Sequence, residues 1–284
     1  MSKLPKHKFD PAPLPAGARI ALRIEYDGTP FSGWQAQPQL EHVRTVQSEV
    51  ERALAAIADS PLRVHCAGRT DSGVHATAQW VHFDAPASRS LKAWVLGGNA
   101  QLPHTVRIAD ARLVTTEFHA RHSAEARVYD YLFANTPTAP ALLAGKALWV
   151  RPALDARRMH EAVQLLLGER DFSAFRAAAC QSRTPMRCLM RAQVVRGGDF
   201  LRLTLVANAF LHHMVRNIVG SLVEVGIGER PVAWLGELLE GRDRTLAAAT
   251  ASPHGLYLTS VHYPSRFLIP DTAAPAFFPE HRAV

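Results

Sequence analysis

Residues 18–26, ARIALRIEY, alternate apolar and polar side chains with a period of two. This period is typical of a strand with one buried face, and the DGTP that follows predicts a turn. Thr45 can then cap a helix, because apolar residues recur at helical spacing through Ile57. Further along, the pattern predicts strands at about 62–66 and at 78–84, a short helix ended by Gly97 and Gly98, and a strand at 106–114. The first part of the chain therefore has the order βαββαβ.

The same order is predicted to restart at Ala126. RVYDYLF reads as a strand, a helix runs from an Asp155 cap to a stop at Gly168, and MRAQVV and DFLRLTLV form a hairpin around Gly197 and Gly198. LHHMVRNIVGSLVEVG is an amphipathic helix, a further helix starts at Pro231, and GLYLTSVHYP is the closing strand. No sequence identity links the halves, so the pattern alone predicts an α+β fold of two ferredoxin-like halves with mainly antiparallel sheets.

The predicted organisation has four parts. A Pro-rich tail covers residues 1–17, the first half 18–124, the second half 125–263, and a second Pro-rich tail 264–284. Both tails are expected to be loosely held.

Composition narrows the class of partner. The net charge is +7 and the pI about 9.7, which favours a polyanionic partner such as nucleic acid. The first 17 residues lack the apolar core of a signal peptide, and no stretch is long and apolar enough to span a membrane, so we expect a cytoplasmic protein with no membrane partner. The three cysteines (Cys66, Cys180 and Cys188) are odd in number and have no CxxC spacing, so neither a disulfide framework nor a zinc site is predicted.

The segment CAGRTDSGVHA, residues 66–76, places a carboxylate in a hinge between two predicted strands. Asp71 could simply cap its own turn, which is the common role of Asp in such a loop. The loop nevertheless carries more donors than a tight turn needs, and its glycines allow close approach of another chain. A carboxylate beside Arg69 would stay ionised at neutral pH and could act as a nucleophile or stabilise positive charge.

AGRTDSGVHA resembles the catalytic loop of the TruA family of tRNA pseudouridine synthases. The resemblance covers roughly residues 19–264 and includes, in the family's order, YDGTPFSGWQ, FHARHSAEARVYDY, DFSAFR, CQSRTP, NAFLHHMVRNIVGSL and TLAAATASPHGLYL. It implies an isomerase that converts uridine to pseudouridine at positions 38–40 of the tRNA anticodon stem-loop, with Asp71 as the catalytic carboxylate. It also implies a homodimer of the pseudouridine synthase fold, with a basic cleft between the two halves of each chain.

The resemblance further implies roles for six other residues. Tyr129 would stack on the target base, and Arg216 would form a salt bridge with Asp71. The residues expected to contact RNA are Arg69, Arg183, His75 and His212. From the residues alone, Tyr129 could equally be a core aromatic and each arginine a surface charge, while Trp34 and Phe210 are expected to pack in the core.

Two other classes of protein remain open at this point. A non-catalytic basic RNA-binding protein would fit the charge and the paired sheets, but it gains nothing from an anion facing phosphates. A carboxylate-dependent hydrolase would need a second acid, and the loop supplies none. For the isomerase, the carboxylate could trap or stabilise the sugar C1′ or assist loss of the 2′ proton, and no cofactor or metal is expected.

Overall fold

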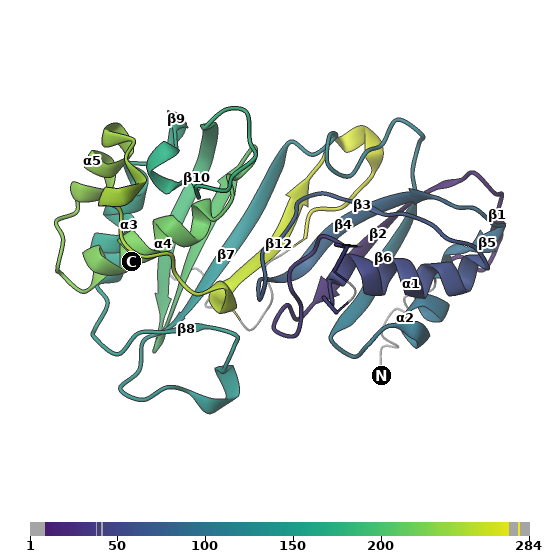
Figure 1. The fold of residues 1–284 in the computed structure, drawn as a ribbon, viewed down its shortest axis with the longest axis horizontal. Coiled ribbons are helices and arrows are strands. Elements are labelled where there is room, and N and C mark those ends of the chain that lie inside the picture. Colours follow the sequence, from purple (N-terminus) through teal and green to yellow (C-terminus); the bar gives the residue numbers. More distant parts are fainter. Residues whose placement is uncertain (1–8, 38, 41, 273–277, 279–284) are drawn as a thin grey trace, which may run out of the picture. The chain divides into compact units, whose positions relative to one another are not determined.

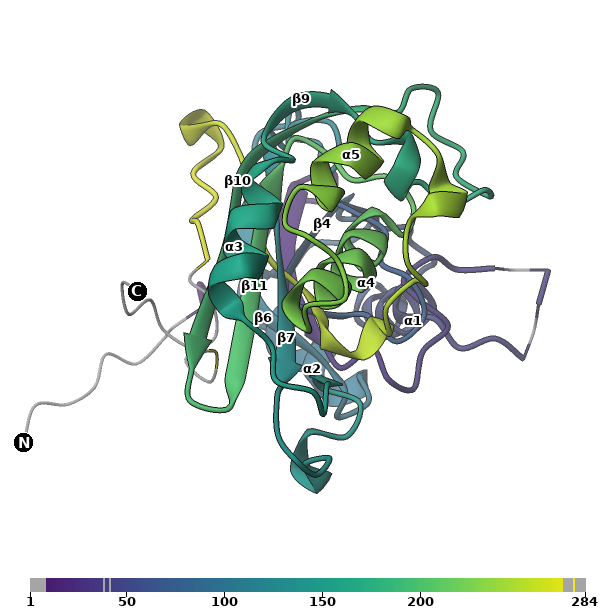
Figure 2. The same ribbon diagram turned by 90° about the vertical axis from the view of Figure 1, so that its left-hand side faces the viewer.

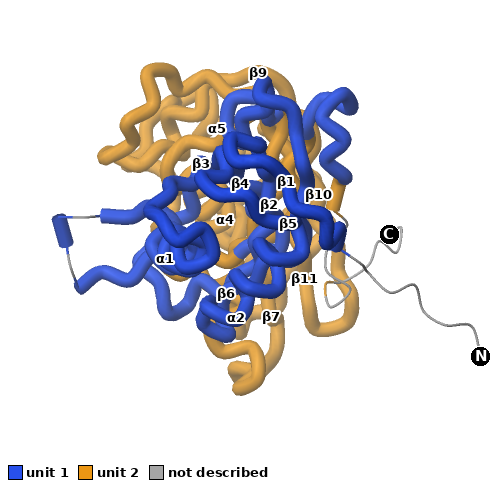
Figure 3. The backbone as a smooth tube through the Cα atoms, turned by 90° about the vertical axis from the view of Figure 1, so that its right-hand side faces the viewer, with its two compact units in different colours: residues 1–72, 76–124, 263–270 blue, residues 73–75, 125–262, 271–284 orange. Residues whose placement is uncertain are grey.

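The computed structural model describes residues 9–37, 39–40, 42–272 and 278. The chain forms two compact units, which Figure 3 colours separately. Unit 1 comprises residues 1–72, 76–124 and 263–270, and unit 2 comprises residues 73–75, 125–262 and 271–284. Within the described part of the chain, no helix is long and apolar enough to cross a membrane.

Unit 1 has the strand order β6-β2-β4, and β3 pairs with the edge of β4 opposite β2 (Figure 1). All three pairings are antiparallel. In chain order the strands therefore lie 4-1-3-2, the order of a ferredoxin-like split βαβ, which confirms the predicted fold. The strands are β2 (Arg19–Tyr26), β3 (His65–Cys66), β4 (His75–Asp84) and β6 (Val106–Leu113).

Helix α1 (Val46–Ala58) begins where the sequence predicts it. The Thr45 hydroxyl accepts a hydrogen bond from the Ser48 N–H, and the Ser48 hydroxyl accepts one from the Thr45 N–H. This capping box satisfies two of the four N–H groups that a helix start leaves open. The stripe that includes Val50 and Leu54 is fully buried, so α1 is held by its packing as well as by its cap.

The second helix of unit 1 does not end at Gly97 and Gly98, and that prediction was wrong. A π-helical turn at Ala93–Gly97 continues directly into α2 (Gly98–Gln101). Both glycines have right-handed helical backbone angles. A Cβ on Gly97 would lie 2.7 Å from Cδ1 of Ile57, and one on Gly98 would lie 2.6 Å from Cδ1 of Ile108. The glycines therefore allow close packing on α1 and β6 instead of terminating the helix.

Unit 2 repeats the same topology with a larger sheet, ordered β12-β7-β11-β10-β9. These pairings are antiparallel, and short β8 (Leu148–Trp149) adds a parallel pairing to β7. Its four main strands again lie 4-1-3-2 in chain order, as predicted from the pattern. The strands are β7 (Ala126–Ala134), β9 (Gly168–Asp171), β10 (Met186–Gly197), β11 (Phe200–Ala207) and β12 (Leu256–His262).

Three helices of unit 2 pack against one another, with α4 and α5 on the same side of the sheet in Figure 2. They are α3 (Ala156–Gln164), α4 (Met214–Gly226) and α5 (Trp234–Gly241). Asp155 caps α3 as predicted, because its side chain accepts hydrogen bonds from the N–H groups of Arg157 and Arg158. The helix ends earlier than expected, and Gly168, with φ +95°, starts β9 instead of stopping α3.

Parts of the two predicted tails are described. Pro13–Leu14 form β1, which pairs with β5 (Arg89–Ser90). Phe278 is buried against Leu132 and Tyr257 of unit 2. Residues 1–8, 273–277 and 279–284, which belong to the predicted tails, lie outside the described residues.

Candidate active site

The loop that carries Asp71 connects β3 to β4 and is anchored on three sides within unit 1. The Thr70 hydroxyl lies 2.7 Å from the Tyr26 hydroxyl of β2, and the Thr70 carbonyl accepts a hydrogen bond from the Trp34 N–H at 3.0 Å. The Gly68 N–H donates to the side chain of Gln79 on β4. Thr70 and Gln79 are buried, so the loop is fixed by satisfied polar contacts inside the unit.

Gly33 is the closest neighbour of the loop from the segment before α1. A Cβ at this position would lie 2.8 Å from the Thr70 carbonyl oxygen and 3.2 Å from the backbone of Asp71. Gly33 also has φ +88°, which disfavours any other residue. Trp34 beside it is 1% exposed, in agreement with the predicted packing role.

The two charged residues of the loop are less buried than the threonine between them. Asp71 is partly buried, Arg69 is exposed, and between them Thr70 is tied to β2. The Ser72 hydroxyl donates to the Phe31 carbonyl at 3.2 Å, so the backbone on both sides of Asp71 is held. A carboxylate on a fixed backbone is the arrangement that catalysis requires.

The three residues after Ser72 belong to unit 2. Gly73 has φ +78°, and a Cβ there would lie 2.9 Å from Cγ of Pro253. His75 is 1% exposed; its Nε2 donates to the carbonyls of Gly145 and His254 at 2.9 and 3.0 Å, and its ring stacks on Tyr257. The predicted contact of His75 with RNA does not fit this position, because burial and two carbonyl partners occupy the imidazole. The two hydrogen bonds of His75 instead hold the end of the segment that follows Asp71.

Arg216 lies in the first turn of α4 in unit 2, where it holds a neighbouring segment. Its Nε donates to the Ala251 carbonyl at 2.8 Å, and the Ala251 N–H donates back to the Arg216 carbonyl at 3.1 Å. One turn later, a Cβ on Gly220 would lie 2.0 Å from the Ala249 carbonyl oxygen. The 249–251 backbone therefore crosses directly over the first turns of α4.

Two buried polar residues of α4 complete this arrangement, and the sequence analysis missed both. Asn217 is fully buried; its amide donates to the Phe175 carbonyl, and its oxygen accepts from Arg244 and Thr250. Ser221, one turn on, accepts from the Ala248 N–H. The sequence did contain a signal for this role, since an Asn and a Ser lie four residues apart on the apolar side of the helix. Buried polar groups need hydrogen-bond partners, so such a pair indicates contact with another segment.

Tyr129 projects from β7 and is 8% exposed. Its ring meets Phe210 edge-on, with centroids 5.0 Å apart and planes at 82°. Phe210 is only partly buried, unlike the core aromatic that we expected. Tyr131, two residues along, is fully buried, its hydroxyl donates to the Ser252 carbonyl, and burial raises its pKa. Tyr129 and Tyr131 thus have different environments on one strand.

His212 and the Arg183 loop lie together in unit 2. The His212 carbonyl accepts from the Ala177 N–H at 3.0 Å, and its own N–H points to Sγ of Cys180 at 3.4 Å. The His212 side chain is exposed. Because Phe210 precedes it by two residues, the Tyr129–Phe210 pair and the 177–183 loop meet at this segment.

The Arg183 loop itself is held by two other arginines. Arg176 donates to the carbonyls of Cys180 and Ser182, and Arg187, which is 9% exposed, donates to the Ser182 hydroxyl and the Thr184 carbonyl. Burial alone would raise the pKa of the Cys180 thiol, but hydrogen bonds from the Ser182 and His212 backbone and the Arg176 charge lower it. Arg183 is exposed, and no described residue forms a hydrogen bond or ion pair with its guanidinium. It is thus presented outward on a rigid loop.

The sequence was compared with known protein families. A model of the family described as "tRNA pseudouridine synthase" matches residues 23–123 and 162–264. The chain belongs to this family. The match includes the Asp71 loop, the Arg183 loop and α4.

Curated relatives named "tRNA pseudouridine synthase A" extend the match over most of the chain. One from Shewanella amazonensis is 51% identical over 92% of this chain and 100% of its own length. One from Cronobacter sakazakii is 53% identical over 89% and 92%, and one from Aliivibrio fischeri is 52% identical over 89% and 95%. A solved structure, "Crystal Structure of a Cbf5-Nop10-Gar1 Complex", aligns with 84% of this chain and 57% of its own at 11% identity and a TM-score of 0.32, too low to support an argument.

Proposed function

We propose that this protein converts uridine to pseudouridine at positions 38–40 of the tRNA anticodon stem-loop, with Asp71 as the catalytic carboxylate. The chain is a tRNA pseudouridine synthase by its family, and it acts as an isomerase on uridine in tRNA. The choice of positions and the role of Asp71 rest on the resemblance of the AGRTDSGVHA loop. The fixed backbone on both sides of Asp71 supports the assignment most strongly.

The reaction requires one carboxylate to act at one carbon of the ribose, C1′. The N1–C1′ bond of the uridine breaks, the base turns, and C5 bonds to the same C1′; C5 then loses its proton and N1 takes one up, so the product is an isomer of uridine. An ionised Asp71 can bond to C1′ or stabilise its positive charge, as glycosidase carboxylates do, or it can take the 2′ proton on the way to a glycal. Each route needs the carboxylate held still relative to the sugar, and the anchored loop meets that need.

Tyr129 and Arg216 are the proposed partners of Asp71 in catalysis. Tyr129 would stack on the uracil and help remove the C5 proton, and Phe210 holds its ring from the edge. Arg216 would pair with the Asp71 carboxylate and orient it. Its bond to the Ala251 carbonyl fixes the direction of the guanidinium, which favours a positioning role over a solvated helix charge.

Arg69, Arg183 and His212 are the proposed RNA contacts. All three are exposed. A stacked uridine must leave its helix before its C1′ is reachable, and Arg69, two residues before Asp71, would assist that step. Arg183 would bind a backbone phosphate. We propose further that the protein acts in the cytoplasm as a homodimer, so that two copies share the contacts to one tRNA.

Mapping pseudouridine in tRNA tests this function directly. A strain that lacks the protein should have uridine at positions 38–40, and the wild-type chain should restore pseudouridine there. The Asp71→Asn variant should not restore it. Asp59→Asn is a matched control, because Asp59 is exposed and has φ +55°, a conformation that Asn adopts readily. Restoration by Asp71→Asn would reject the catalytic role, and loss of pseudouridine at other positions would reject the proposed specificity.

A further inference from the structure

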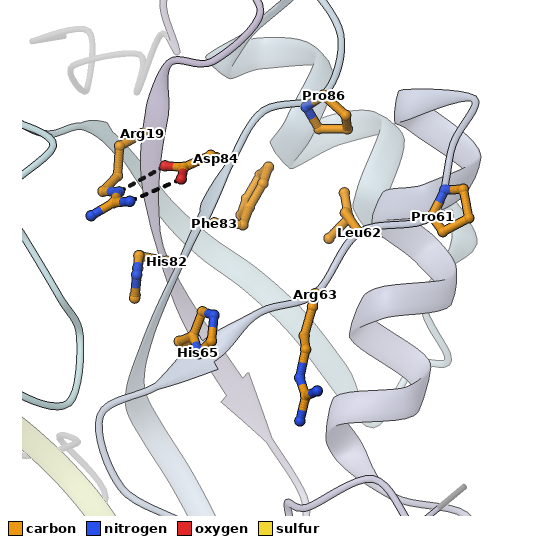
Figure 4. A pocket seen from close by; sticks show the side chains of 9 residues that line it. All are labelled: Arg19, Pro61, Leu62, Arg63, His65, His82, Phe83, Asp84 and Pro86. Atoms are coloured by element: carbon orange, nitrogen blue, oxygen red, sulfur yellow. Dashed lines mark hydrogen bonds and ion pairs between the residues drawn. The ribbon is translucent and has the colours of Figure 1, made fainter.

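A concave site lies in unit 1, outside the Asp71 loop. It is a cavity of about 260 Å³ between the end of α1, β3 and the last residues of β4 (Figure 4). Leu62, Phe83 and Pro86 supply apolar walls, and arginine and histidine side chains supply the polar ones. None of the residues to which a role is assigned above lines it.

On one polar wall of the cavity, the charges of Arg19 and Asp84 neutralise each other. Arg19 donates through Nε and Nη2 to the two carboxylate oxygens of Asp84 at 2.7 and 2.8 Å, as Figure 4 shows. Its Nη1 donates to the carbonyls of Thr116 and Phe118. The only carboxylate in the lining is thus already paired, and it does not make the cavity attractive to a cation.

His82 offers a directed donor on the other side. Its Nδ1 accepts a hydrogen bond from the Ala120 N–H at 3.1 Å, so the neutral ring carries its proton on Nε2. The residue is 3% exposed, and no described residue accepts a hydrogen bond from Nε2. Burial, together with the nearby His119 and His65, lowers the pKa of His82 to about 4. At neutral pH the buried ring is therefore an uncharged N–H donor lining the cavity without a partner.

His65 and Arg63 complete the donor set from β3 and the residues before it. His65 stacks on His82, with centroids 5.1 Å apart and planes at 27°. Both His65 and Arg63 are exposed. Within the described part of the chain, Arg63 forms no hydrogen bond or ion pair. The cavity thus combines one unneutralised guanidinium with two imidazoles, and it has no unpaired anion of its own.

We propose that this cavity binds a backbone phosphate of the tRNA, at a nucleotide other than the one that reacts. Guanidinium and N–H donors match a phosphate, and the apolar walls fit the sugar or base beside it. This inference rests on the proposed function, which supplies the tRNA.

Chain geometry places the cavity within reach of the same RNA. His65 precedes Asp71 by six residues, so the two lie at most about 20 Å apart along the chain. At roughly 3.4 Å of helix axis per nucleotide, that span corresponds to about six nucleotides of one strand. The separation thus permits Arg63 to contact a phosphate within about six nucleotides of a target uridine held at Asp71.

The test measures tRNA affinity against salt for wild type, Arg63→Gln, Arg63→Lys, His65→Phe and Arg157→Gln. Arg157 is an exposed arginine on α3 of unit 2 that is paired with Glu161, so its loss removes a charge from the surface outside the cavity, and His65→Phe keeps the stacked ring while it removes the nitrogens. Arg63→Gln should weaken binding about fivefold near 0.1 M salt and lower the slope of log Kd against log salt by about one. Arg63→Lys should retain the slope, and His65→Phe should weaken binding about twofold. Single-turnover rates at saturating tRNA should stay within about twofold of wild type, because no contact to the reacting uridine is lost.

The outcomes separate the pocket from the proposed function. If wild type makes pseudouridine but Arg63→Gln binds tRNA like Arg157→Gln, the pocket proposal is wrong and the function stands. If wild type makes no pseudouridine at positions 38–40, the proposed function itself is wrong, whatever Arg63→Gln does to tRNA binding. Histidine NMR distinguishes the source of phosphate: the His82 Nε2 proton should shift with a tRNA stem-loop and remain unmoved by inorganic phosphate at the same ionic strength. A response to inorganic phosphate alone would overturn RNA binding at this site.

Discussion

The two units share one strand order and differ in the connections that carry function. In unit 1 the link between the second and third strands, β3 and β4, is the loop with Asp71, tied down by Tyr26, Trp34 and Gln79. In unit 2 the equivalent link between β10 and β11 is a hairpin turn at Gly198 and Asp199. The repeated topology supplies the strands, and the proposed catalytic carboxylate, Asp71, occurs where one copy departs from the other.

The first helix after the third strand differs between the units in the opposite way. In unit 1 it is the short pair formed by the 93–97 turn and α2, and its glycines pack on Ile57 and Ile108. In unit 2 it is α4, with 13 residues, whose polar side chains hold the 244–252 segment. Unit 1 therefore carries its candidate carboxylate, Asp71, in a loop, whereas unit 2 carries its polar side chains on helix α4.

Glycine substitutions in these two helices should sharpen the contrast. In Gly220→Ala the new Cβ meets the Ala249 carbonyl oxygen at 2.0 Å, so backbone must move, and we expect a loss of about 3 kcal/mol in the free energy of unfolding. In Gly98→Ala the Cβ meets the flexible end of Ile108, and the loss should be about 1 kcal/mol. Urea unfolding measures both. Equal losses in the free energy of unfolding would show that the contact of Gly220 with the 249–251 backbone is no tighter than that of Gly98 with Ile108.

Acid should destabilise the protein through His82 in unit 1. Its pKa of about 4 lies below the ordinary 6.5, so the unfolded chain binds the proton more tightly. The stabilisation from the neutral His82 ring is present above about pH 6.5 and is lost as the pH falls towards 4. Between pH 7.5 and 5 the free energy of unfolding should decrease by about 2 kcal/mol from this residue. His119, whose pKa is also lowered, acts in the same direction. His82→Gln, whose oxygen can still accept from Ala120, should unfold in urea with a smaller dependence on pH; an unchanged dependence would contradict this account.

Substitution of the exposed arginines in the two units should have different effects on tRNA affinity and on turnover. Arg183→Ala in unit 2 should weaken tRNA binding a few-fold and lower the salt slope by about one unit or less, with turnover at saturation preserved. Arg69→Ala in unit 1 should lower turnover more than affinity, because extrusion of the uridine contributes only after the base leaves the stack. Single-turnover rates on paired and unpaired target uridines separate the roles. Equal defects of Arg69→Ala on both substrates would reject base extrusion.

Local pattern was enough to predict most of the fold. The period-two strands and the Thr45 and Asp155 caps were confirmed because their causes lie within a few residues of each other. Gly97 and Gly98 were misread as a helix end, since their reason is contact with Ile57 and Ile108, which only the folded chain brings near.

The candidate site was predictable to a smaller extent. The loop around Asp71 was visible as a hinge with too many polar groups for a turn. The burial of His75 was not, because its carbonyl partners at Gly145 and His254 are 70 and 179 residues away. The partners of Asn217 are likewise distant in sequence, so its role emerges only from packing.

The central claim is that the anchored carboxylate of unit 1 performs the chemistry, and purified enzyme tests it most directly. Single-turnover pseudouridine formation on one tRNA should be compared for wild type, Asp71→Asn and Asp59→Asn, with tRNA affinity measured in parallel. The account predicts at least a thousandfold lower rate for Asp71→Asn, roughly the worth of an essential catalytic group, with tRNA affinity equal or slightly higher and Asp59→Asn unchanged. A rate for Asp71→Asn within about tenfold of wild type would contradict it.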